Sequence, residues 1–331
     1  MTMYKKKRLT VIAPVFNEED VIEKFYIEVK KVFAKIAASY SAQLLFVVDR
    51  CSDGTTTILR RLAATDPELH VLTLSSRFGH QMSLLAGIDH AQDADILIMM
   101  DSDLQHPPEL IPQLLRQHEL GNDVVYTVRA DNVDAGIVRK AAGNLFYRVL
   151  NYFTEVPVNA NAADFRLISK RVAHVMRAGV RERNMFLRGL FTWIGFNQVA
   201  VEYVASKRAG GASKYSLSRM IALATAGILS FSTRPLKLSI FLGLGFASIG
   251  FLIGLATLVE YFVNRSIPNG WTTIVMLLLL FSGVQLIVLG ILGAYIGGIY
   301  EEVKARPHYI IDEAINFTVK QPLDLNERVE T

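Results

Sequence analysis

The sequence predicts an α/β domain built on a parallel sheet, followed by a helix in the membrane interface and a hairpin of two membrane-spanning helices. Two observations lead to this prediction. Short apolar runs alternate with helical patterns over residues 1–212, and two long apolar runs that together hold a single charge follow at 238–263 and 272–299. The alternation is typical of parallel strands joined by helices, and each long run exceeds the roughly 20 residues that cross a bilayer as a helix.

Composition agrees with a protein that is partly embedded in a membrane. Of 331 residues, 51% are hydrophobic and 20% are charged, and the mean hydropathy is +0.29. This apolar content excludes a disordered chain, and the single cysteine excludes a disulfide scaffold. The net charge of +4 fits an anionic membrane surface, a phosphorylated substrate or nucleic acid about equally. Because no stripe of basic and aromatic residues is present, we exclude nucleic acid.

Strands and helices are expected in strict alternation in the first domain. Strands are predicted at 9–15, 44–49, 69–75, 94–101 and 123–129. Helices are predicted at 19–39, 55–66, 80–91 and 107–120. Asn17 or Asp20 is available to cap the first helix. Ligands of such sheets bind beyond the carboxyl ends of the strands, so the polar clusters that follow the strands are the candidate site.

Charged residues separate the predicted membrane spans from the segments on either side of them. Residues 213–237 carry a partial apolar face with flanking cations, which predicts an amphipathic juxtamembrane helix, the alternative being an ordinary helix of the first domain. A short join with Pro268 and Gly270 makes the spans antiparallel. Lysine and arginine gather before the first span and after the second, which places both flanks, including the tail at 301–331, in the cytoplasm. The expected location is therefore the cytoplasmic membrane, crossed more than once.

Both spans contain glycines four residues apart, Gly250 with Gly254 and Gly293 with Gly297. Such spacing allows two helix backbones to approach closely. We expect packing within the hairpin, and the alternative is a contact in a homo-oligomer.

The segment DSDLQHPPE at 101–109 follows the fourth predicted strand directly. A turn directly after the strand can bring the carboxylates of Asp101 and Asp103 to one point, and Gln105 can add a neutral oxygen. Oxygen ligands suit Mg²⁺ or Mn²⁺, and such an ion can bridge a diphosphate and stabilise a phosphate leaving group. We expect a divalent metal site here.

Three further clusters follow the other strands. Pro14, Asn17 and Glu18 lie at the end of the first strand and can line a base or ribose site, although an ordinary strand–helix turn explains them equally well. Asp49, after the second strand, can accept hydrogen bonds from a base or ribose. Gly79, after the third strand, permits close approach of the backbone to a ligand.

Together these pieces resemble glycosyltransferase family 2, nucleotide-sugar-dependent enzymes with a GT-A (Rossmann-like) fold. More narrowly they resemble the polyprenyl-phosphate glycosyltransferases, which include bacterial undecaprenyl-phosphate glucosyltransferases and, more distantly, dolichol-phosphate mannose synthases. The resemblance runs along nearly the whole chain. The segments that carry it are APVFNEE, SRFGHQ, DSDLQHPPELIPQLL, NAADFRLISKRV, RERNMFLRGLFTWIGF, GGASKYSLSRM, the hairpin and YIGGIYEEVKARPHYII.

One departure from the family pattern lies after the second strand. The family usually has two adjacent acids followed by Gly-Ser, whereas this sequence has Asp49-Arg50-Cys51-Ser52-Asp53. Asp49 matches the first acid and Arg50 replaces the second. The departure concerns the nucleotide contacts and the identity of the base, and it leaves the metal site untouched.

The resemblance implies a donor, an acceptor and a residue for each. A nucleotide diphosphate sugar binds at the clusters above and at Gln81 and Asp101, and Asp101, Asp103 and Gln105 hold the ion. The acceptor is polyprenyl phosphate. Asp164 lies near the anomeric centre and orients or assists the acceptor, the alternative being a salt bridge with Arg166. Arg188 helps to hold the two anions together.

A cationic loop is expected to clamp the acceptor and the diphosphate. Its residues are Arg208, Ser213 and Lys214, and simple attraction of anionic headgroups is the alternative for the two cations. If the acceptor attacks in a single displacement from the face opposite the leaving group, the configuration of the anomeric carbon is inverted.

The sequence leaves three interpretations of the function open. We favour glucose transfer from UDP-glucose, with GDP-mannose or a UDP-aminoarabinose as other donors. A processive polysaccharide synthase has the same fold but usually more spans. A non-catalytic nucleotide-sugar sensor is disfavoured by the intact Asp101, Asp103 and Asp164.

Overall fold

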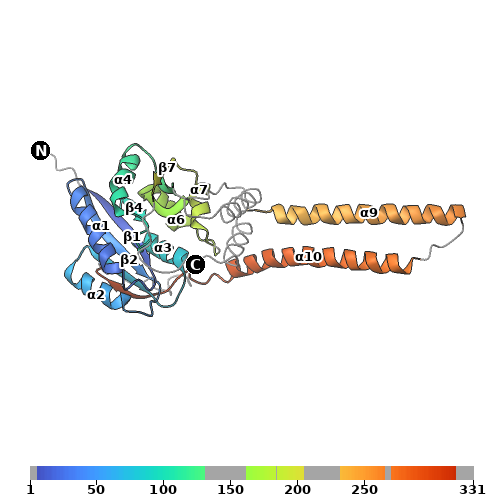
Figure 1. Cartoon of the computed structure of the whole chain (residues 1–331), viewed down its shortest axis with the longest axis horizontal. Coiled ribbons are helices and arrows are strands. Elements are labelled where there is room, and N and C mark those ends of the chain that lie inside the picture. Colours follow the sequence, from blue (N-terminus) through green and yellow to red (C-terminus); the bar gives the residue numbers. More distant parts are fainter. Residues whose placement is uncertain (1–5, 131–161, 184, 205–231, 265–269, 318–331) are drawn as a thin grey trace, which may run out of the picture.

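The computed structural model describes residues 6–130, 162–183, 185–204, 232–264 and 270–317. Figure 1 shows a sheet domain from one end of which two long helices project side by side. The sheet has eight strands in the order β7-β5-β6-β4-β1-β2-β3-β8. The strands are β1 (Lys7–Val15), β2 (Tyr40–Val48), β3 (Leu69–Leu74), β4 (Ile96–Met99), β5 (Val124–Arg129), β6 (Ala162–Ser169), β7 (Gln198–Tyr203) and β8 (Ile311–Ile315).

The centre of the sheet is parallel, as the sequence predicts. β1 pairs in parallel with β2 and β4, and β2 pairs in parallel with β3. These strands are buried almost along their whole length, because helices cover both faces of the sheet. Their carboxyl ends therefore meet at one edge, where the candidate residues follow.

The outer part of the sheet is mixed, which corrects the prediction of a parallel sheet. β6 lies antiparallel between β4 and β5, β7 runs parallel to β5, and β8 runs antiparallel to β3. The parallel prediction relied on helices crossing over between strands, whereas β6 follows the long segment 131–161 and β8 follows the hairpin. β6 matters most for function, because it brings Asp164 beside the end of β4.

Helices cover the two faces in two groups. One core cluster packs under α1 (Ile22–Ile36), α2 (Thr55–Thr65) and α4 (Ile111–Glu119), and the other under α3 (His80–His90), α6 (Lys170–Gly179) and α7 (Leu187–Trp193). A short 3-10 turn at Pro108–Leu110 leads into α4. α3 lies so close to β1 that a Cβ atom on Gly87 would overlap the side chain of Ile12.

The predicted cap of the first helix is wrong. α1 begins at Ile22, with Val21 at its N-cap and no side chain capping it. Asn17 instead exchanges hydrogen bonds with Ser52 in the next loop. This side chain therefore joins two loops at the carboxyl edge of the sheet rather than ending a helix.

The hairpin consists of α9 (Arg234–Asn264) and α10 (Trp271–Val303). Both helices are long and apolar enough to span a membrane, and apolar side chains such as Phe241 and Phe251 point outward with about 70% exposure. Gly250 approaches Phe281 of α10, but a Cβ on Gly254, Gly293 or Gly297 would have no neighbouring atom within 4 Å. In the described part of the hairpin, the helices thus meet at Gly250 and at the Phe246–Phe281 ring pair, and the expected close packing at the other three glycines is absent.

The chain returns from the hairpin to its own sheet domain. The Arg183 N–H donates to Glu302 at the end of α10 at 2.5 Å, and the Tyr309 hydroxyl donates to Asp89 at 2.7 Å. Arg181 binds both oxygens of the same Asp89 at 2.9 and 2.7 Å. β8 then joins the sheet beside β3. These contacts fasten the hairpin to the domain on its carboxyl-terminal side.

Candidate active site

The candidate site lies at the carboxyl edge of the sheet. Pro14 is near the end of β1, Asp49 directly follows β2, and Asp101 lies two residues beyond β4. Such an edge is where sheets of this kind bind ligands, because loops and helix starts converge there.

Asp49 is a buried carboxylate that holds the loop after β3. Its oxygens accept the backbone N–H groups of Phe78 at 2.7 Å and Gly79 at 2.9 Å, and the residue is 4% exposed. Gly79 has φ +92°, a conformation that favours glycine, and α3 begins at the next residue. Asp49 therefore fixes the start of α3, and its predicted contact with a base or ribose stays a prediction.

The loop after β1 is tied to its neighbours. Asn17 Nδ2 donates to the Ser52 hydroxyl at 3.0 Å, and the Ser52 N–H donates to Asn17 Oδ1 at 2.9 Å. The Glu18 N–H donates to Thr55 at 2.9 Å, and the carbonyl of Pro14 accepts from the buried Ser102 hydroxyl at 3.1 Å. Pro14, Asn17 and Glu18 thus lie where the loops after neighbouring strands meet, and their predicted part in a base or ribose site stays a prediction.

Arg50, which stands where the family usually has a second acid, points to the loop after β3. Its guanidinium donates to the carbonyl of Ser75, and its φ is +44°. In the same loop, the Arg77 guanidinium lies over the Phe16 ring at 3.9 Å from its centroid. Two cations therefore connect the loops after β1, β2 and β3.

Asp101 is the centre of a charged cluster. Its Oδ1 lies 2.8 Å from His80 Nε2, and its Oδ2 lies 3.6 Å from His106 Nδ1. The N–H of Asp101 donates to that same His106 Nδ1 at 3.0 Å. His106 is 5% exposed and stacks on Phe165. Neither histidine is identified by sequence spacing; the one signal for them is that both lie inside motifs that follow strands.

The pKa values of Asp101 and His80 reflect their pairing. Burial raises the pKa of Asp101, but His106 and His80 outweigh it, so the pKa lies below its usual value. Burial lowers the pKa of His80, but the hydrogen bond and charge of Asp101 outweigh it, so that pKa is raised. Each of the two side chains therefore favours the charged form of the other.

The donor set at this turn fits a hard divalent ion. Asp101 and Asp103 are half-buried carboxylates two residues apart, and the Gln105 N–H donates to Asp103 Oδ1 at 3.0 Å. The described residues contain no group of three His, Cys, Asp or Glu side chains poised to hold a metal. Mg²⁺ commonly binds through one or two carboxylates and completes its shell with water and phosphate oxygens. The predicted ligation by Asp101, Asp103 and Gln105 stays a prediction.

Asp164 and Arg188 form the second half of the site. Arg188 donates two hydrogen bonds to Asp164, at 2.7 and 2.8 Å, from the first turn of α7 to β6. Arg166, predicted as the alternative partner, lies farther away at 3.9 Å. Burial raises the pKa of Asp164, but Arg188 outweighs it, so the pKa is well below its usual value. Asp164 is an ionised group with a fixed orientation.

The Asp101 cluster and the Asp164–Arg188 pair interact electrostatically. The charge of Asp164 acts on both His80 and Asp101, so the two acids lie within electrostatic range of one another. Gln81 connects them physically, because its Oε1 accepts the Leu187 N–H at the start of α7 at 3.1 Å. The predicted role of Gln81 in donor binding is untested, whereas its link between α3 and α7 is direct.

The predicted clamp of Arg208, Ser213 and Lys214 lies outside the described residues.

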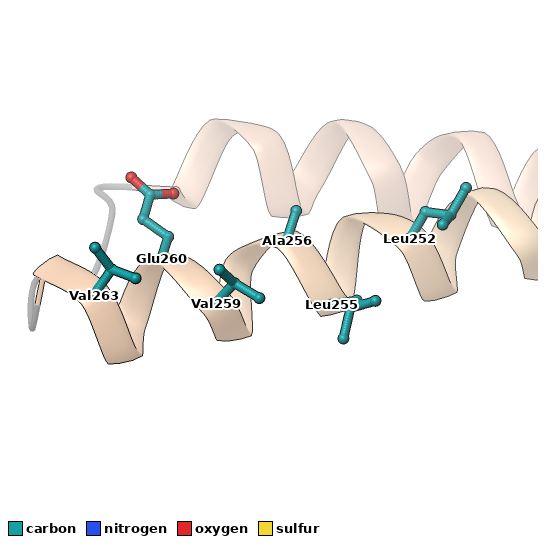
Figure 2. A pocket seen from close by; sticks show the side chains of 6 residues that line it. All are labelled: Leu252, Leu255, Ala256, Val259, Glu260 and Val263. Atoms are coloured by element: carbon teal, nitrogen blue, oxygen red, sulfur yellow. The ribbon is translucent and has the colours of Figure 1, made fainter.

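A surface groove on the membrane hairpin is apolar, unlike the charged edge of the sheet. It lies on the distal part of α9, and Figure 2 shows its side chains, among which Glu260 is the one charged group. The lining residues are Leu252, Leu255, Ala256, Val259, Glu260 and Val263. An apolar groove on a span is suited to lipid chains rather than to a polar sugar donor.

Comparison with known proteins identifies the domain. The family model described as "Glycosyl transferase family 2" matches residues 10–176. The chain belongs to glycosyltransferase family 2. It is 37% identical over 307 residues to the "Bactoprenol glucosyl transferase" of Shigella phage SfII, covering 93% of this chain and 98% of the relative. It is also 37% identical to the "Uncharacterized glycosyltransferase YkcC" of Bacillus subtilis, covering 96% and 98%.

Membership of this family confirms the predicted GT-A domain and the predicted sugar-transferring activity. Among solved structures, the chain resembles a mannosyltransferase from Pyrobaculum calidifontis in complex with GDP-Man and Mn²⁺. The TM-score is 0.47 at 17% identity, and the match covers 68% of this chain and 64% of that one. Together with the two spans, the family places the chain among membrane-associated glycosyltransferases.

Proposed function

We propose that the protein transfers glucose from UDP-glucose to polyprenyl phosphate with inversion at the anomeric carbon. The observation that carries the proposal is the length of chain over which the sequence is similar to bactoprenol glucosyl transferases. The similarity covers 93% of the chain and therefore includes both the charged edge of the sheet and the hairpin. A polyprenol acceptor explains why a sugar-transferring domain is fastened to two membrane helices.

The acceptor chemistry agrees with the groups in the site. A phosphate monoester has a second pKa near 6, so it is largely a dianion at neutral pH and needs no strong base to become a nucleophile. Asp164 is ionised and held by Arg188, so it is poorly suited to accept a proton. It orients Arg188 instead, and that guanidinium is the group that draws the acceptor phosphate toward the donor.

The leaving group is a nucleoside diphosphate, which needs positive charge as its bond to the sugar breaks. Asp101 and Asp103 would hold a Mg²⁺ or Mn²⁺ ion, with Gln105 adding an oxygen, and the ion supplies Lewis-acid stabilisation of the diphosphate when bound. The loops that carry Asn17, Arg50 and Arg77 contact one another, and the remaining end of the donor would bind beside them.

Orientation follows from the charges that flank the spans. Lys and Arg lie before α9 and after α10, and the sheet domain is fastened to the end of α10 by Arg183 and Glu302. The positive-inside tendency supports a cytoplasmic position of the sheet domain.

The test uses purified full-length protein in detergent, Mg²⁺ or Mn²⁺, radiolabelled nucleotide sugars and undecaprenyl phosphate. UDP-glucose should label a chloroform-soluble lipid, and Asp103→Asn should abolish the labelling. Asp93→Asn is the matched control, because Asp93 belongs to the same domain and its side chain is 85% exposed.

Each other outcome rejects a part of the proposal. Labelling from GDP-mannose or a UDP-aminoarabinose alone would reject the donor. A long water-soluble polymer would replace the proposal with a processive synthase, and tight donor binding without turnover would replace it with a sensor. Equal activity of Asp103→Asn and Asp93→Asn would show that the chemistry lies elsewhere.

A further inference from the structure

His80 is a histidine whose position is fixed more firmly than a surface side chain requires. It is the first residue of α3, directly after Gly79. The preceding loop is held by the two N–H bonds to Asp49, and the Ser83 hydroxyl donates to the carbonyl of Gly79 at 3.2 Å. The His80 side chain is nevertheless 40% exposed, so it stands on the open side of the sheet edge.

His80 forms a hydrogen bond with Asp101, the carboxylate that is expected to bind the divalent ion. Its Nε2 lies 2.8 Å from Asp101 Oδ1, which requires a hydrogen on that nitrogen. The other nearby imidazole is arranged differently, because His106 Nδ1 accepts the N–H of Asp101 and has its lone pair, not a hydrogen, on that side. Within the described ranges, His80 is therefore the side chain that donates to the Asp101 carboxylate.

A metal ion and an imidazole N–H compete for the same oxygen lone pair. An ion that binds Asp101 through Oδ1 must first displace His80, whose side chain is 40% exposed. The carboxylate is 36% exposed, so the exchange needs no opening of the core.

We propose that His80 occupies Asp101 in the metal-free enzyme and is displaced by the divalent ion, so that His80 sets how tightly the site binds the ion. This inference rests on the proposed function only in taking Asp101 as a ligand of the ion. His80 is thus a positioning residue that weakens ion binding in the absence of donor. The diphosphate oxygens of a bound donor would add ligands and overcome this competition.

The test measures Mn²⁺ binding directly, with no nucleotide sugar and no acceptor present. Free Mn²⁺ is followed by electron paramagnetic resonance as it is titrated into the detergent-solubilised full chain at fixed pH. His80→Ala removes the competing donor, so the variant should bind Mn²⁺ roughly tenfold more tightly, the size expected for loss of a hydrogen bond to a charged group. His80→Gln keeps an amide donor and should fall between the two.

Controls separate competition from damage to the fold. His118→Gln changes a histidine on α4 that bonds the carbonyl of Asn122, and it should leave Mn²⁺ affinity unchanged. Asp101→Asn should weaken binding in either background. Far-ultraviolet circular dichroism and the unfolding midpoint show whether each variant folds.

Several results would overturn the inference. Weaker Mn²⁺ binding in His80→Ala would make His80 a ligand rather than a competitor, and unchanged binding would give it no part in the site. Binding that survives Asp101→Asn, or no binding by any variant, would also reject it. A wrong donor or acceptor in the proposed function does not affect these results, because neither compound is present.

Discussion

The sheet domain and the hairpin use the same apolar residue types in opposite ways. Phe46 in β2 is fully buried, whereas Phe251 in α9 is 71% exposed. In the domain, apolar side chains pack against one another, and in the hairpin they face outward along both helices. An apolar run alone therefore does not indicate a protein core. The length of the run and the absence of polar neighbours decide whether lipid or protein covers it.

The largest expected difference between the regions concerns carboxylates. Asp164→Asn leaves Arg188 without its ion pair and removes the fixed orientation of that guanidinium, so transfer to polyprenyl phosphate should fall roughly 10³-fold. Glu260→Gln makes the same chemical change on α9 and should alter the rate by less than about twofold. Initial rates of glycolipid formation measure both, and equal losses would place part of the chemistry in the hairpin.

A second comparison uses two phenylalanines. Phe46→Ala empties space beside Phe25, whose ring centroid is 5.8 Å away, and should lower the free energy of unfolding by about 3–5 kcal/mol. Phe251→Ala removes an outward-facing ring and should change it by less than about 0.5 kcal/mol in detergent. Urea titrations of the solubilised chain give both values. A large loss in Phe251→Ala would mean that another helix covers that face.

A third comparison uses two glycines inside helices. A Cβ on Gly87 would overlap Ile12, so Gly87→Ala should cost about 1–3 kcal/mol. A Cβ on Gly254 would meet no atom within 4 Å, so Gly254→Ala should be neutral or slightly stabilising because alanine favours helix. The same urea titrations measure the pair. Adding Ile12→Ala should make Gly87→Ala less costly, and a cost at Gly254 would point to a helix packed there from another copy.

The sequence was informative where strands are wholly buried and less so at the edges of the sheet. β1 to β4 read as apolar runs because both of their faces are covered. β7 and β8 are the two edge strands, and exposed residues interrupt both, so neither forms the continuous apolar run that identified β1 to β4. β6 is interior, but the buried charge of Arg166 interrupts its apolar run.

At the candidate site, the sequence predicts which residues belong to it but not which of them contact one another. The motif at a strand end predicts Asp101 and Asp103, and the family resemblance predicts Asp164 and Arg188. The structure brings Asp164 and Arg188 into direct contact. Spacing along the chain could not show that Asp49 turns inward to the loop after β3, or that His80 reaches across to Asp101. Such pairings depend on how separate loops face each other, which a linear pattern does not record.

The smallest expected effect lies where the two regions join. Glu182 has a buried Oε2 without a hydrogen-bond partner among the described residues, and burial together with the nearby charge of Glu302 raises its pKa. A carboxyl whose pKa is raised on folding contributes stability below its unfolded pKa of about 4.3, and that contribution is lost as the pH rises through the folded pKa. At neutral pH the charged group therefore opposes folding.

Glu182→Gln removes this charge at the junction. The variant should unfold about 1–2 °C higher than the parent at pH 7. The difference should shrink as the pH falls and vanish below about pH 3, where the carboxyl is protonated in both states. Glu68→Gln serves as the control, because Glu68 is a surface acid that pairs with Lys30 and should not stabilise on neutralisation. If Glu182→Gln lowers the midpoint at pH 7, the carboxylate has a cationic partner at the junction.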